Sequence, residues 1–409
     1  MERILPGVIP TMGQARSGVE EKLKRSEVFE IADRLLEHIR NGTTDSDERG
    51  PIRVPATTYT DPGLFERERE GIFANAPQLV CLSGDIPEPG DYVTLDDLGL
   101  GLLILRDEER RVRSFLNACT HRGARLAEGR GQLKDGLICP YHGWAFRLDG
   151  SLDAVAHAAS FGNVAASDHA LRELPCGESG GLVFSAPRPE ADFDLEAHMG
   201  TLAEELDDFD LSQCVPVKSG LFDVEANWKL CLDTFSEGYH FPVLHRDSLS
   251  QMTIGNVMTY DRFGERGEHH RLGYPARTII ELGQRKRNDW GDPYEHFGCV
   301  YFIYPNVSML VSGQYVDLFR IYPGHSVNRQ RTHYSLYARK PLKNGEGRAA
   351  ALDYFDYNYH VVEKEDFWVS ECAQRNLDTG ALAEITFGRN EPALINLHEV
   401  MRRALDSKP

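Results

Sequence analysis

Two short segments of the chain each combine one cysteine with one histidine. In the first, one residue separates Cys119 from His121, and in the second, two residues separate Cys139 from His142. Two thiolates and two imidazoles could hold Zn²⁺, but structural zinc sites usually take two cysteines from one turn and two histidines from another. A [2Fe–2S] cluster with two thiolates on one iron and two imidazoles on the other needs the pairing found here. We therefore expect such a cluster and keep zinc as the alternative.

A second group of candidate ligands lies about a hundred residues later. His240 and His245 are five positions apart, and on one continuous helix their side chains would point about 140° away from each other. Pro242 lies between them and is expected to break the helix. We therefore expect His240 to end a helix and His245 to lie in the following turn. Glu237, three residues before His240, would share its helical face and accept the second ring N–H of that histidine.

Two histidines need one carboxylate to complete the facial triad that binds Fe(II) in oxygen-activating enzymes. The predicted helix over residues 361–375 offers candidates for it. Asp366 lies on an apolar stripe of this helix, but Glu365 lies on a neighbouring apolar stripe, so helical periodicity does not separate the two. The carboxylates of this helix are Glu363, Glu365, Asp366 and Glu371.

The elements that would position these residues fall into two groups. Short strands with frequent turn signals predict a small β domain between about residues 78 and 186. Longer strands and two helices follow in the second half, and strands that cluster apart from helices indicate an α+β fold. The predicted strands are 92–95, 102–105, 112–116, 137–139, 182–185, several within 300–323 with turns at Pro305-Asn306 and Gly313, and 331–339. The predicted helices are one capped by Ser26 and ending at Asn41, one over 347–377 and one over 391–406.

The remaining segments are interpreted as connections. Residues 42–54 are polar and rich in turn formers. Residues 187–210 hold nine acids and one base, which predicts a solvated connector with a short helix. Residues 246–299 are polar and irregular, which predicts a substrate-entry loop or a solvated excursion. The resulting division is an N-terminal helical segment (1–54), a cluster domain (55–186) and a second domain (187–409).

Composition excludes several classes of protein. The chain has 409 residues, with 45 lysines and arginines against 63 aspartates and glutamates, so its formal net charge is −18. This charge argues against nucleic acid and polybasic membrane-surface partners. No apolar run is long enough to cross a bilayer, and the N-terminus lacks the pattern of a signal peptide. Eight cysteines are too few for a disulfide scaffold, so we expect reduced or metal-bound thiols in the cytoplasm.

The motifs resemble those of the Rieske non-haem iron oxygenases, the aromatic ring-hydroxylating family, in their catalytic α subunit. The resemblance extends over nearly the whole chain after about residue 50. It includes Asn-Trp-Lys at 227–229, YFIYPN at 301–306 and GRNEPAL at 388–394. Ala124 and Tyr141 stand where respiratory Rieske proteins carry an additional pair of cysteines, which matches the oxygenase branch.

The resemblance implies a fold, two cofactors and their ligands. The fold is a small all-β Rieske domain followed by a helix-grip catalytic domain, in which a curved antiparallel sheet wraps around a long helix. The [2Fe–2S] cluster would be held by the four cysteines and histidines of the first group. The mononuclear Fe(II) would be held by His240, His245 and Asp366, because the family places the aspartate of a Glu-Asp pair on the iron.

The resemblance also implies partners. A separate reductase, with or without a ferredoxin, would load electrons onto the cluster. Subunits would form a head-to-tail homotrimer, with or without a small β subunit. Glu237 would join His240 to His142 of a neighbouring subunit, at a position where most family members carry aspartate.

The family's activity would be the use of O₂ and reductase-supplied electrons to hydroxylate an aromatic or alicyclic ring. The alternative is monooxygenation or demethylation of a quaternary amine such as carnitine or a betaine, since some of these relatives also carry glutamate at the bridging position. A pure electron carrier and a zinc protein are the other two classes, and the iron content per chain separates all three. Tyr239, Phe241, Phe302 and Tyr304 are expected to be core residues rather than a cage for a cation.

Overall fold

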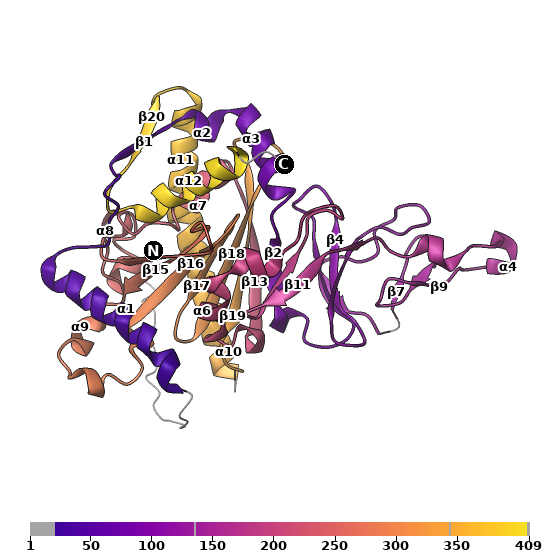
Figure 1. Ribbon diagram of the computed structural model, residues 1–409, viewed down its shortest axis with the longest axis horizontal. Coiled ribbons are helices and arrows are strands. Elements are labelled where there is room, and N and C mark those ends of the chain that lie inside the picture. The colour runs from indigo at the N-terminus through magenta and orange to yellow at the C-terminus, as the bar shows by residue number, and fades with distance from the viewer. Residues whose placement is uncertain (1–20, 135, 343–344, 407–409) are drawn as a thin grey trace.

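The computed structural model describes residues 21–134, 136–342 and 345–406 of the chain (Figure 1). The molecule is elongated, and two small sheets and their loops extend from one end of a larger body (Figure 1). The larger body contains a seven-stranded antiparallel sheet and the long helices. This arrangement confirms the predicted α+β class. The predicted division at residues 54 and 186 stays a prediction.

The cluster half is built from short antiparallel strands, as predicted. One sheet has the order β10-β5-β4-β3-β6, a second has the order β11-β12-β2, and a third has the order β7-β8-β9. Buried Leu103, Leu105, Phe115 and Phe146 form the apolar core beneath the two cysteine–histidine segments. The strands are β2 (Gln78–Leu82), β3 (Asp91–Leu95), β4 (Leu102–Arg106), β5 (Val112–Leu116), β6 (Arg130–Gln132), β7 (Leu137–Ile138), β8 (Ala145–Phe146), β9 (Leu152–Ala154), β10 (Glu173–Leu174), β11 (Cys176–Ser179) and β12 (Leu182–Ser185).

The second half contains the sheet of order β13-β19-β18-β17-β16-β15-β14, in which every neighbouring pair is antiparallel. The predicted turns at Pro305-Asn306 and Gly313 do separate consecutive strands, because proline and glycine interrupt the ladder there. The strands are β13 (Val215–Val224), β14 (Thr259–Phe263), β15 (His269–Pro275), β16 (Phe297–Ile303), β17 (Val307–Val311), β18 (Tyr315–Pro323) and β19 (Gln330–Ala338).

One long helical stretch crosses this sheet (Figure 1). It consists of α10 (Gly345–Val361), the π-helical turn η8 (Val362–Asp366) and α11 (Phe367–Asp378), which together cover the predicted helix over 347–377. Phe355 of α10 stacks on Tyr334 of β19, with ring centroids 4.6 Å apart. The last helix, α12 (Pro392–Asp406), agrees with its prediction and buries Leu394, Leu397 and Met401.

The N-terminal helix α1 (Glu21–Asn41) ends where predicted, and Gly42 follows with a left-handed φ of +63°. The predicted start is wrong, because Ser26 lies inside the helix rather than at its cap. The preceding residues, Glu-Lys-Leu-Lys at 21–24, are good helix formers and extend the helix backwards. Residues 1–20, which belong to the predicted N-terminal segment, lie outside the described residues.

The acidic segment 187–210 is more than a solvated connector. It folds into α5 (Leu195–Met199) and α6 (Thr201–Asp207), and Leu202 and Leu206 are fully buried. The side chain of Glu205 is 8% exposed, and it accepts a 2.6 Å hydrogen bond from Tyr301 Oη and forms an ion pair with Arg271. The acid count misled the prediction, because the helices place their leucines on one face against the sheet.

The prediction of an irregular loop over 246–299 is also wrong, because it too relied on the polar composition of the segment. This segment supplies β14 and β15, and every residue of β15 is buried. Arg271 interrupts the apolar pattern of β15, but its charge is neutralised by Asp261 at 3.0 Å and by Glu205. The segment also contains the short helix α9 (Ile279–Leu282), and the one-turn helix α8 (Phe241–Leu244) directly precedes it.

Residues 42–54 are also partly ordered into a strand. β1 (Ile52–Pro55) pairs with β20 (Glu384–Phe387), which ties the N-terminal segment to the C-terminal part of the chain. The next helices are α2 (Thr57–Thr60) and α3 (Pro62–Glu68). Within the described ranges, no helix is both long enough and apolar enough to cross a lipid bilayer.

A buried ion pair connects α3 to α7 (Trp228–Asp233), the helix that precedes the predicted iron ligands. Lys229 Nζ lies 2.7 Å from the Glu68 carboxylate, and both side chains are 2% exposed. Trp228 Nε1 donates a second hydrogen bond of 2.9 Å to the same carboxylate.

Replacing Glu68 with alanine should therefore lower the free energy of unfolding by about 3–5 kcal/mol, because the Lys229 ammonium would stay buried without a counter-charge. Chemical denaturation of the variant measures this loss. Glu66→Ala is the control, since Glu66 lies on the same helix with its side chain 57% exposed. Equal losses in the two variants would contradict the importance of the buried pair.

Candidate functional site

The two cysteine–histidine segments fold into matching turns. The N–H of Cys119 donates to the carbonyl of Ala124, and the N–H of Gly123 donates to the carbonyl of Cys119, both at 2.8 Å. In the second turn, Cys139 and Gly143 make the equivalent hydrogen bonds at 2.8 and 3.0 Å. Both glycines have left-handed φ angles, +73° and +69°, which a residue with a Cβ rarely adopts. The two turns therefore present their cysteine and histidine in the same way.

The four predicted cluster ligands meet at one point. The rings of His121 and His142 lie 4.7 Å apart, and each thiol is within hydrogen-bonding reach of the other. The Nδ1 atoms of both histidines are buried and have no hydrogen-bond partner in the described part of the chain. Buried nitrogens without partners suit metal ligands, so the donor set fits a [2Fe–2S] cluster. Trp144 stacks on His121 at 4.8 Å and holds its ring in place.

The second predicted site is also assembled. The Nε2 atoms of His240 and His245 lie 3.0 Å apart, and Asp366 Oδ1 lies 3.5 and 3.2 Å from them. Ligand atoms of the three residues all lie within 4.8 Å of one another. His245 and Asp366 are buried and His240 is nearly so. Two imidazoles and one carboxylate that converge in this way fit a mononuclear Fe(II), although their role as ligands stays a prediction.

The local fold differs from the prediction for the histidines. His240 does not end a helix; it lies directly before the one-turn helix α8, and His245 lies directly after it. Pro242 is the second residue of α8 and begins the helix rather than breaking one, because the first turn needs no N–H from that position. The single turn brings both rings to the same point, which one continuous helix would not allow.

The triad carboxylate comes from the π-helical turn η8, of which Asp366 is the last residue. A π turn inserts one extra residue into a helix and is frequently found at functional sites. It also shifts the helical phase, which explains why an undistorted period did not separate Asp366 from Glu365. The Asp366 side chain is 6% exposed and the Glu365 side chain is 26% exposed.

Glu365 supports the triad instead of joining it. Its carboxylate accepts hydrogen bonds from His245 Nδ1 at 2.6 Å and from Ser248 Oγ at 2.7 Å. This bond fixes the tautomer of His245 so that Nε2 is free for a metal. The helical pattern predicted Glu365 only as an alternative ligand and did not indicate this supporting role, although its position next to Asp366 is a signal for it.

Glu365→Ala should weaken Fe(II) binding by about 10–100-fold, because a ligating histidine that loses its carboxylate partner is less basic and less well oriented. Iron content after dialysis at a series of Fe(II) concentrations measures the effect. Glu363→Ala is the matched control, since Glu363 points away and pairs with Lys364 at 2.8 Å. Unchanged iron affinity in Glu365→Ala would contradict the orienting role.

Glu237 supports the other histidine. It lies in the loop between α7 and α8, not on a helical face as predicted, and its Oε1 accepts a hydrogen bond from His240 Nδ1. Its Oε2 accepts from the N–H of Tyr239 and of His240, which holds the carboxylate in place. Its predicted contact with a neighbouring subunit stays a prediction.

The electrostatic field of the site favours a cation. Burial lowers the pKa of His240, but hydrogen bonds with Asp366 and Glu237 outweigh burial and raise this pKa to about 10. Burial would raise the pKa of Asp366, but the two histidines lower it below its usual range. The lowered pKa keeps Asp366 ionised, and a divalent metal would satisfy the same field.

The other candidate residues of the sequence do not belong to the triad. Among the remaining carboxylates of the helix, Glu371 accepts a hydrogen bond from the N–H of Glu225 rather than reaching the triad. Phe302 is buried in the core, as expected, whereas Tyr239 is 60% exposed. Phe241 contacts the rings of both triad histidines at 4.9 and 5.4 Å and so forms one wall of the site.

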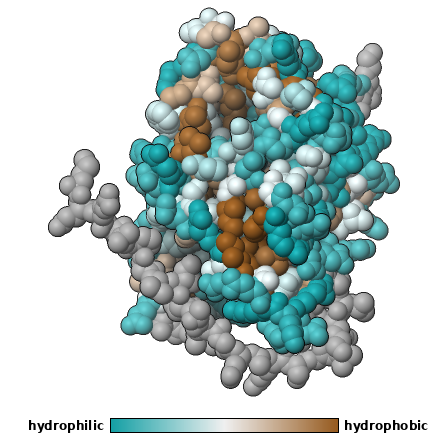
Figure 2. Space-filling model, turned by 90° about the vertical axis from the view of Figure 1, so that its left-hand side faces the viewer, coloured by the Kyte–Doolittle hydropathy of each residue, from teal (hydrophilic) through white to brown (hydrophobic). Residues whose placement is uncertain are grey.

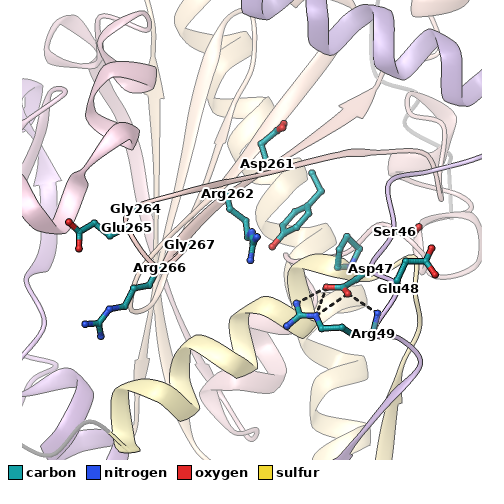
Figure 3. A pocket seen from close by; sticks show the side chains of 12 residues that line it. Ser46, Asp47, Glu48, Arg49, Asp261, Arg262, Gly264, Glu265, Arg266 and Gly267 are labelled. Atoms are coloured by element: carbon teal, nitrogen blue, oxygen red, sulfur yellow. Dashed lines mark hydrogen bonds and ion pairs between the residues drawn. The ribbon is translucent and has the colours of Figure 1, made fainter.

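A surface groove of about 890 Å³ lies apart from both sites. It is bordered by residues 46–49, by the turn between β14 and β15, and by the start of α12. Charged side chains line it, including the hydrogen-bonded pair Asp47 and Arg49 (Figure 3). None of the predicted ligands borders this groove, so it is not the metal centre.

The turn that joins the triad histidines reaches the surface. Figure 2 shows the face of the molecule that carries α1, α8 and α9, with apolar side chains gathered in two areas among hydrophilic ones. Val243 of α8 is 82% exposed.

Comparison with known proteins divides the chain into the same two parts, a cluster domain and a catalytic domain. Residues 76–170 match the family model of the Rieske [2Fe–2S] domain, and residues 210–407 match that of the ring hydroxylating α subunit, catalytic domain. These two domains carry a [2Fe–2S] cluster and a mononuclear non-haem iron, in agreement with the two ligand sets. The zinc alternative is therefore wrong, and a pure electron carrier would not need the catalytic domain.

Several relatives are similar over most or part of the chain. The carnitine monooxygenase oxygenase subunit of Acinetobacter baumannii is 31% identical over 335 residues, which cover 79% of this chain and 84% of that protein. The Escherichia coli protein of the same name is 34% identical over 201 residues, 47% of this chain, so the chain spans about half (52%) of its length. The choline monooxygenase of Spinacia oleracea is 28% identical, with 80% and 72% covered.

Solved structures show the same fold. The quaternary ammonium Rieske monooxygenase CntA has a TM-score of 0.74 at 22% identity, with 86% of this chain and 95% of that chain covered. Naphthalene 1,2-dioxygenase has a TM-score of 0.70 at 18% identity, with 87% and 92% covered. The two domains, their ligand sets and these relatives agree, and the chain belongs to the Rieske non-haem iron oxygenases, with the architecture of their catalytic α subunit.

Proposed function

We propose that the chain is the oxygenase subunit of a Rieske monooxygenase that acts on a small quaternary ammonium compound. The observation that carries this proposal is the similarity to carnitine monooxygenase over 84% of that protein's length, beside several choline monooxygenases. Ring hydroxylation, the first expectation from the family, has weaker support, because naphthalene dioxygenase resembles the chain only in its fold. The quaternary amine alternative therefore replaces it.

The charges around the triad support a cationic substrate. Glu237 and Glu365 adjoin the triad histidines, and Glu391 at the start of α12 interacts with the same charges. Burial raises the pKa of Glu391, and the neighbouring carboxylates of Glu237 and Asp233 raise it further. These carboxylates would repel an anionic group of a substrate and attract a cationic one.

The chain's own residues divide the work of the reaction. When bound, the mononuclear iron supplies the place where O₂ is activated beside the substrate, and the [2Fe–2S] cluster supplies electrons. His240, His245 and Asp366 would hold that iron. Glu237 and Glu365 each hold the Nδ1 proton of one histidine and so keep both Nε2 atoms directed at the metal. Phe241 excludes water from one side of the pair.

We propose further that electrons pass between subunits and that a separate reductase loads them. The cluster turns and α8 lie towards opposite ends of the elongated molecule (Figure 1), which favours transfer to a neighbouring copy over transfer within one chain. The solved structure of CntA is described as giving insight into inter-subunit electron transfer. Tyr141, beside the cluster ligand His142, is 57% exposed, as a contact between copies would require.

A substrate panel tests the proposal. The purified subunit, supplied with a surrogate Rieske reductase and NADH, would be given carnitine, γ-butyrobetaine, choline, glycine betaine, benzoate and naphthalene. Substrate-dependent O₂ consumption with product formation is expected for at least one quaternary amine and for neither aromatic compound. Product formation from an aromatic ring alone would overturn the proposal and restore ring hydroxylation.

A further inference from the structure

The surface groove of about 890 Å³ beside β14 and the start of α12 contains arginines without partners. Arg262 and Arg266 both line it, and both are exposed. Within the described part of the chain, neither guanidinium group forms an ion pair or a hydrogen bond. Arginine is well suited to bind a carboxylate, because its planar group donates two parallel hydrogen bonds.

Most acids of the groove are already neutralised. The pairs are Asp47 with Arg49 at 2.6 Å, Glu48 with Arg389 at 3.5 Å and Asp261 with Arg34 at 2.8 Å. Glu265 is the acid of the lining that has no cationic partner among the described residues. The unpaired charges are therefore two arginines and one glutamate, so the groove attracts an anionic group.

Arg262 projects into the open part of the groove. Figure 3 shows its side chain between the turn at 264–267 on one side and Asp47 with Arg49 on the other. Hydrogen bonds with Arg49 lower the pKa of Asp47, and the charge of Arg262 lowers it further from across the groove. Arg262 therefore faces the groove without being held by either wall.

Tyr260 contributes a hydroxyl to the same place. It precedes Arg262 by two residues on β14, so both side chains lie on one face of the strand. Its Oη is buried and has no hydrogen-bond partner among the described residues, although buried hydroxyls are nearly always hydrogen bonded. Burial raises the pKa of Tyr260, Arg262 lowers it and Asp47 raises it, so the hydroxyl lies near both charges. A carboxylate bound by Arg262 would supply the missing acceptor.

The same tyrosine connects the groove with the wall of the triad. Tyr260, Tyr274 and Phe241 belong to one small apolar cluster, which also contains Met258, Leu272 and Ala393. The rings of Phe241 and Tyr274 lie 5.3 Å apart, and Phe241 contacts both triad histidines. The groove and the triad therefore border the same cluster of side chains.

The start of α12 provides a second connection. Pro392 borders the groove, and the preceding residue, Glu391, interacts electrostatically with Glu237 and His240 beside the triad. A cationic group that enters the groove past Pro392 would be attracted towards these carboxylates. An anionic group of the same molecule would remain at the arginines.

We propose that the groove is the first binding site of the substrate, and that this substrate is a quaternary ammonium compound that also carries a carboxylate. This inference rests on the proposed function. Arg262 and Tyr260 bind the carboxylate, while the ammonium end faces Glu391 and the triad. The carboxylate is released when the substrate moves past the cluster to the triad, so no molecule has to span the two sites. Arg262 thus acts on the capture of the substrate and not on its oxidation.

Pairs of substrates that differ in the carboxylate test this inference. Glycine betaine is paired with choline, which has a hydroxymethyl group in its place, and carnitine is paired with its methyl ester. The holoenzyme with a surrogate reductase should show a higher kcat/KM for the carboxylate member of at least one pair. Arg262→Gln should lower this kcat/KM by about tenfold, because KM rises while kcat is nearly unchanged. The values for choline and for the ester should change little.

Two further variants complete the test. Arg285→Gln removes an exposed arginine that does not border the groove and should change none of these values. Tyr260→Phe keeps the ring, removes the hydroxyl and should raise KM for the carboxylate compound by about threefold. The visible absorption of the cluster and the thermal unfolding midpoint verify that the variants are folded.

The outcomes separate this inference from the proposed function. If Arg262→Gln has no effect, or affects both members of a pair equally, the groove does not bind the carboxylate, although the proposed function stands. Oxidation of choline without oxidation of any carboxylate compound would likewise overturn only the inference. If wild type oxidises no quaternary amine, both are wrong.

Discussion

Replacing Asp366 with alanine should abolish turnover and remove the mononuclear iron, while the visible absorption of the [2Fe–2S] cluster is unchanged. Asp366 contributes the only carboxylate oxygen of the group formed with His240 and His245. Without it, two neutral imidazoles remain, which bind Fe(II) far more weakly than a set that includes an anion. The iron content should fall from about three to about two atoms per chain.

The neighbouring glutamate provides the comparison for this variant. Excess Fe(II) should restore activity to Glu365→Ala, which keeps all three ligands, but not to Asp366→Ala. Metal analysis and turnover would be measured for both variants before and after Fe(II) addition. If Asp366→Ala kept its iron and Glu365→Ala lost it irreversibly, the assignment of the two carboxylates would have to be exchanged.

Replacing Glu237 with glutamine should keep both metal centres and still reduce turnover by at least about tenfold. The neutral amide can accept the hydrogen bond from His240 Nδ1 but no longer carries the negative charge that stabilises the ring. If the carboxylate also links His240 to a neighbouring subunit, the loss falls on electron transfer. Single-turnover experiments, in which reduced enzyme is mixed with O₂ and substrate, would show slower reoxidation of the cluster.

Glu237→Asp is the matched control, because it keeps the charge and shortens the side chain by one methylene. Because aspartate can still accept the hydrogen bond from His240, this variant should retain most of its activity. Reoxidation at the wild-type rate in Glu237→Gln would show that the charge of Glu237 has no part in the reaction. Loss of the mononuclear iron from that variant would instead assign Glu237 a purely structural role.

The cluster site could be predicted from the sequence because its information is local. Each cysteine and histidine lies in one turn, and a glycine with a left-handed backbone follows at the same place in both turns. Strand ends such as Val112–Leu116 and Leu182–Ser185 were predicted for a similar reason, since turn residues directly border them. These features can therefore be predicted from residues that are close together in the sequence.

The structure brings the predicted catalytic residues together, but their local geometry differs from the prediction. His240 and His245 border a single helical turn, and the π turn before Asp366 shifts the helical phase. Both features depend on packing against the sheet, which no regular period describes. The charged residues of segments 187–210 and 246–299 also led to wrong predictions. Arg271 and Glu205 form an ion pair inside the protein, whereas a charged sequence usually indicates a segment exposed to solvent.

Asp317 lay outside any pattern that the sequence offered. It is one acid in the strand β18, and its neighbours in space, Tyr354 and Asn358, come from a helix some forty residues later. Only the fold brings these partners to the carboxylate, because contacts between residues so far apart in the chain leave no local spacing in the sequence.

The most direct test of the central claim is product analysis under ¹⁸O₂ with the purified subunit, a surrogate reductase and a quaternary ammonium substrate from the panel. A monooxygenase inserts one atom of O₂ into the substrate and reduces the other to water with two electrons. We predict an oxidised product that carries a single ¹⁸O atom, or the carbonyl fragment released from it. A product with two labelled oxygens on an aromatic ring, and none from any quaternary amine, would contradict the account.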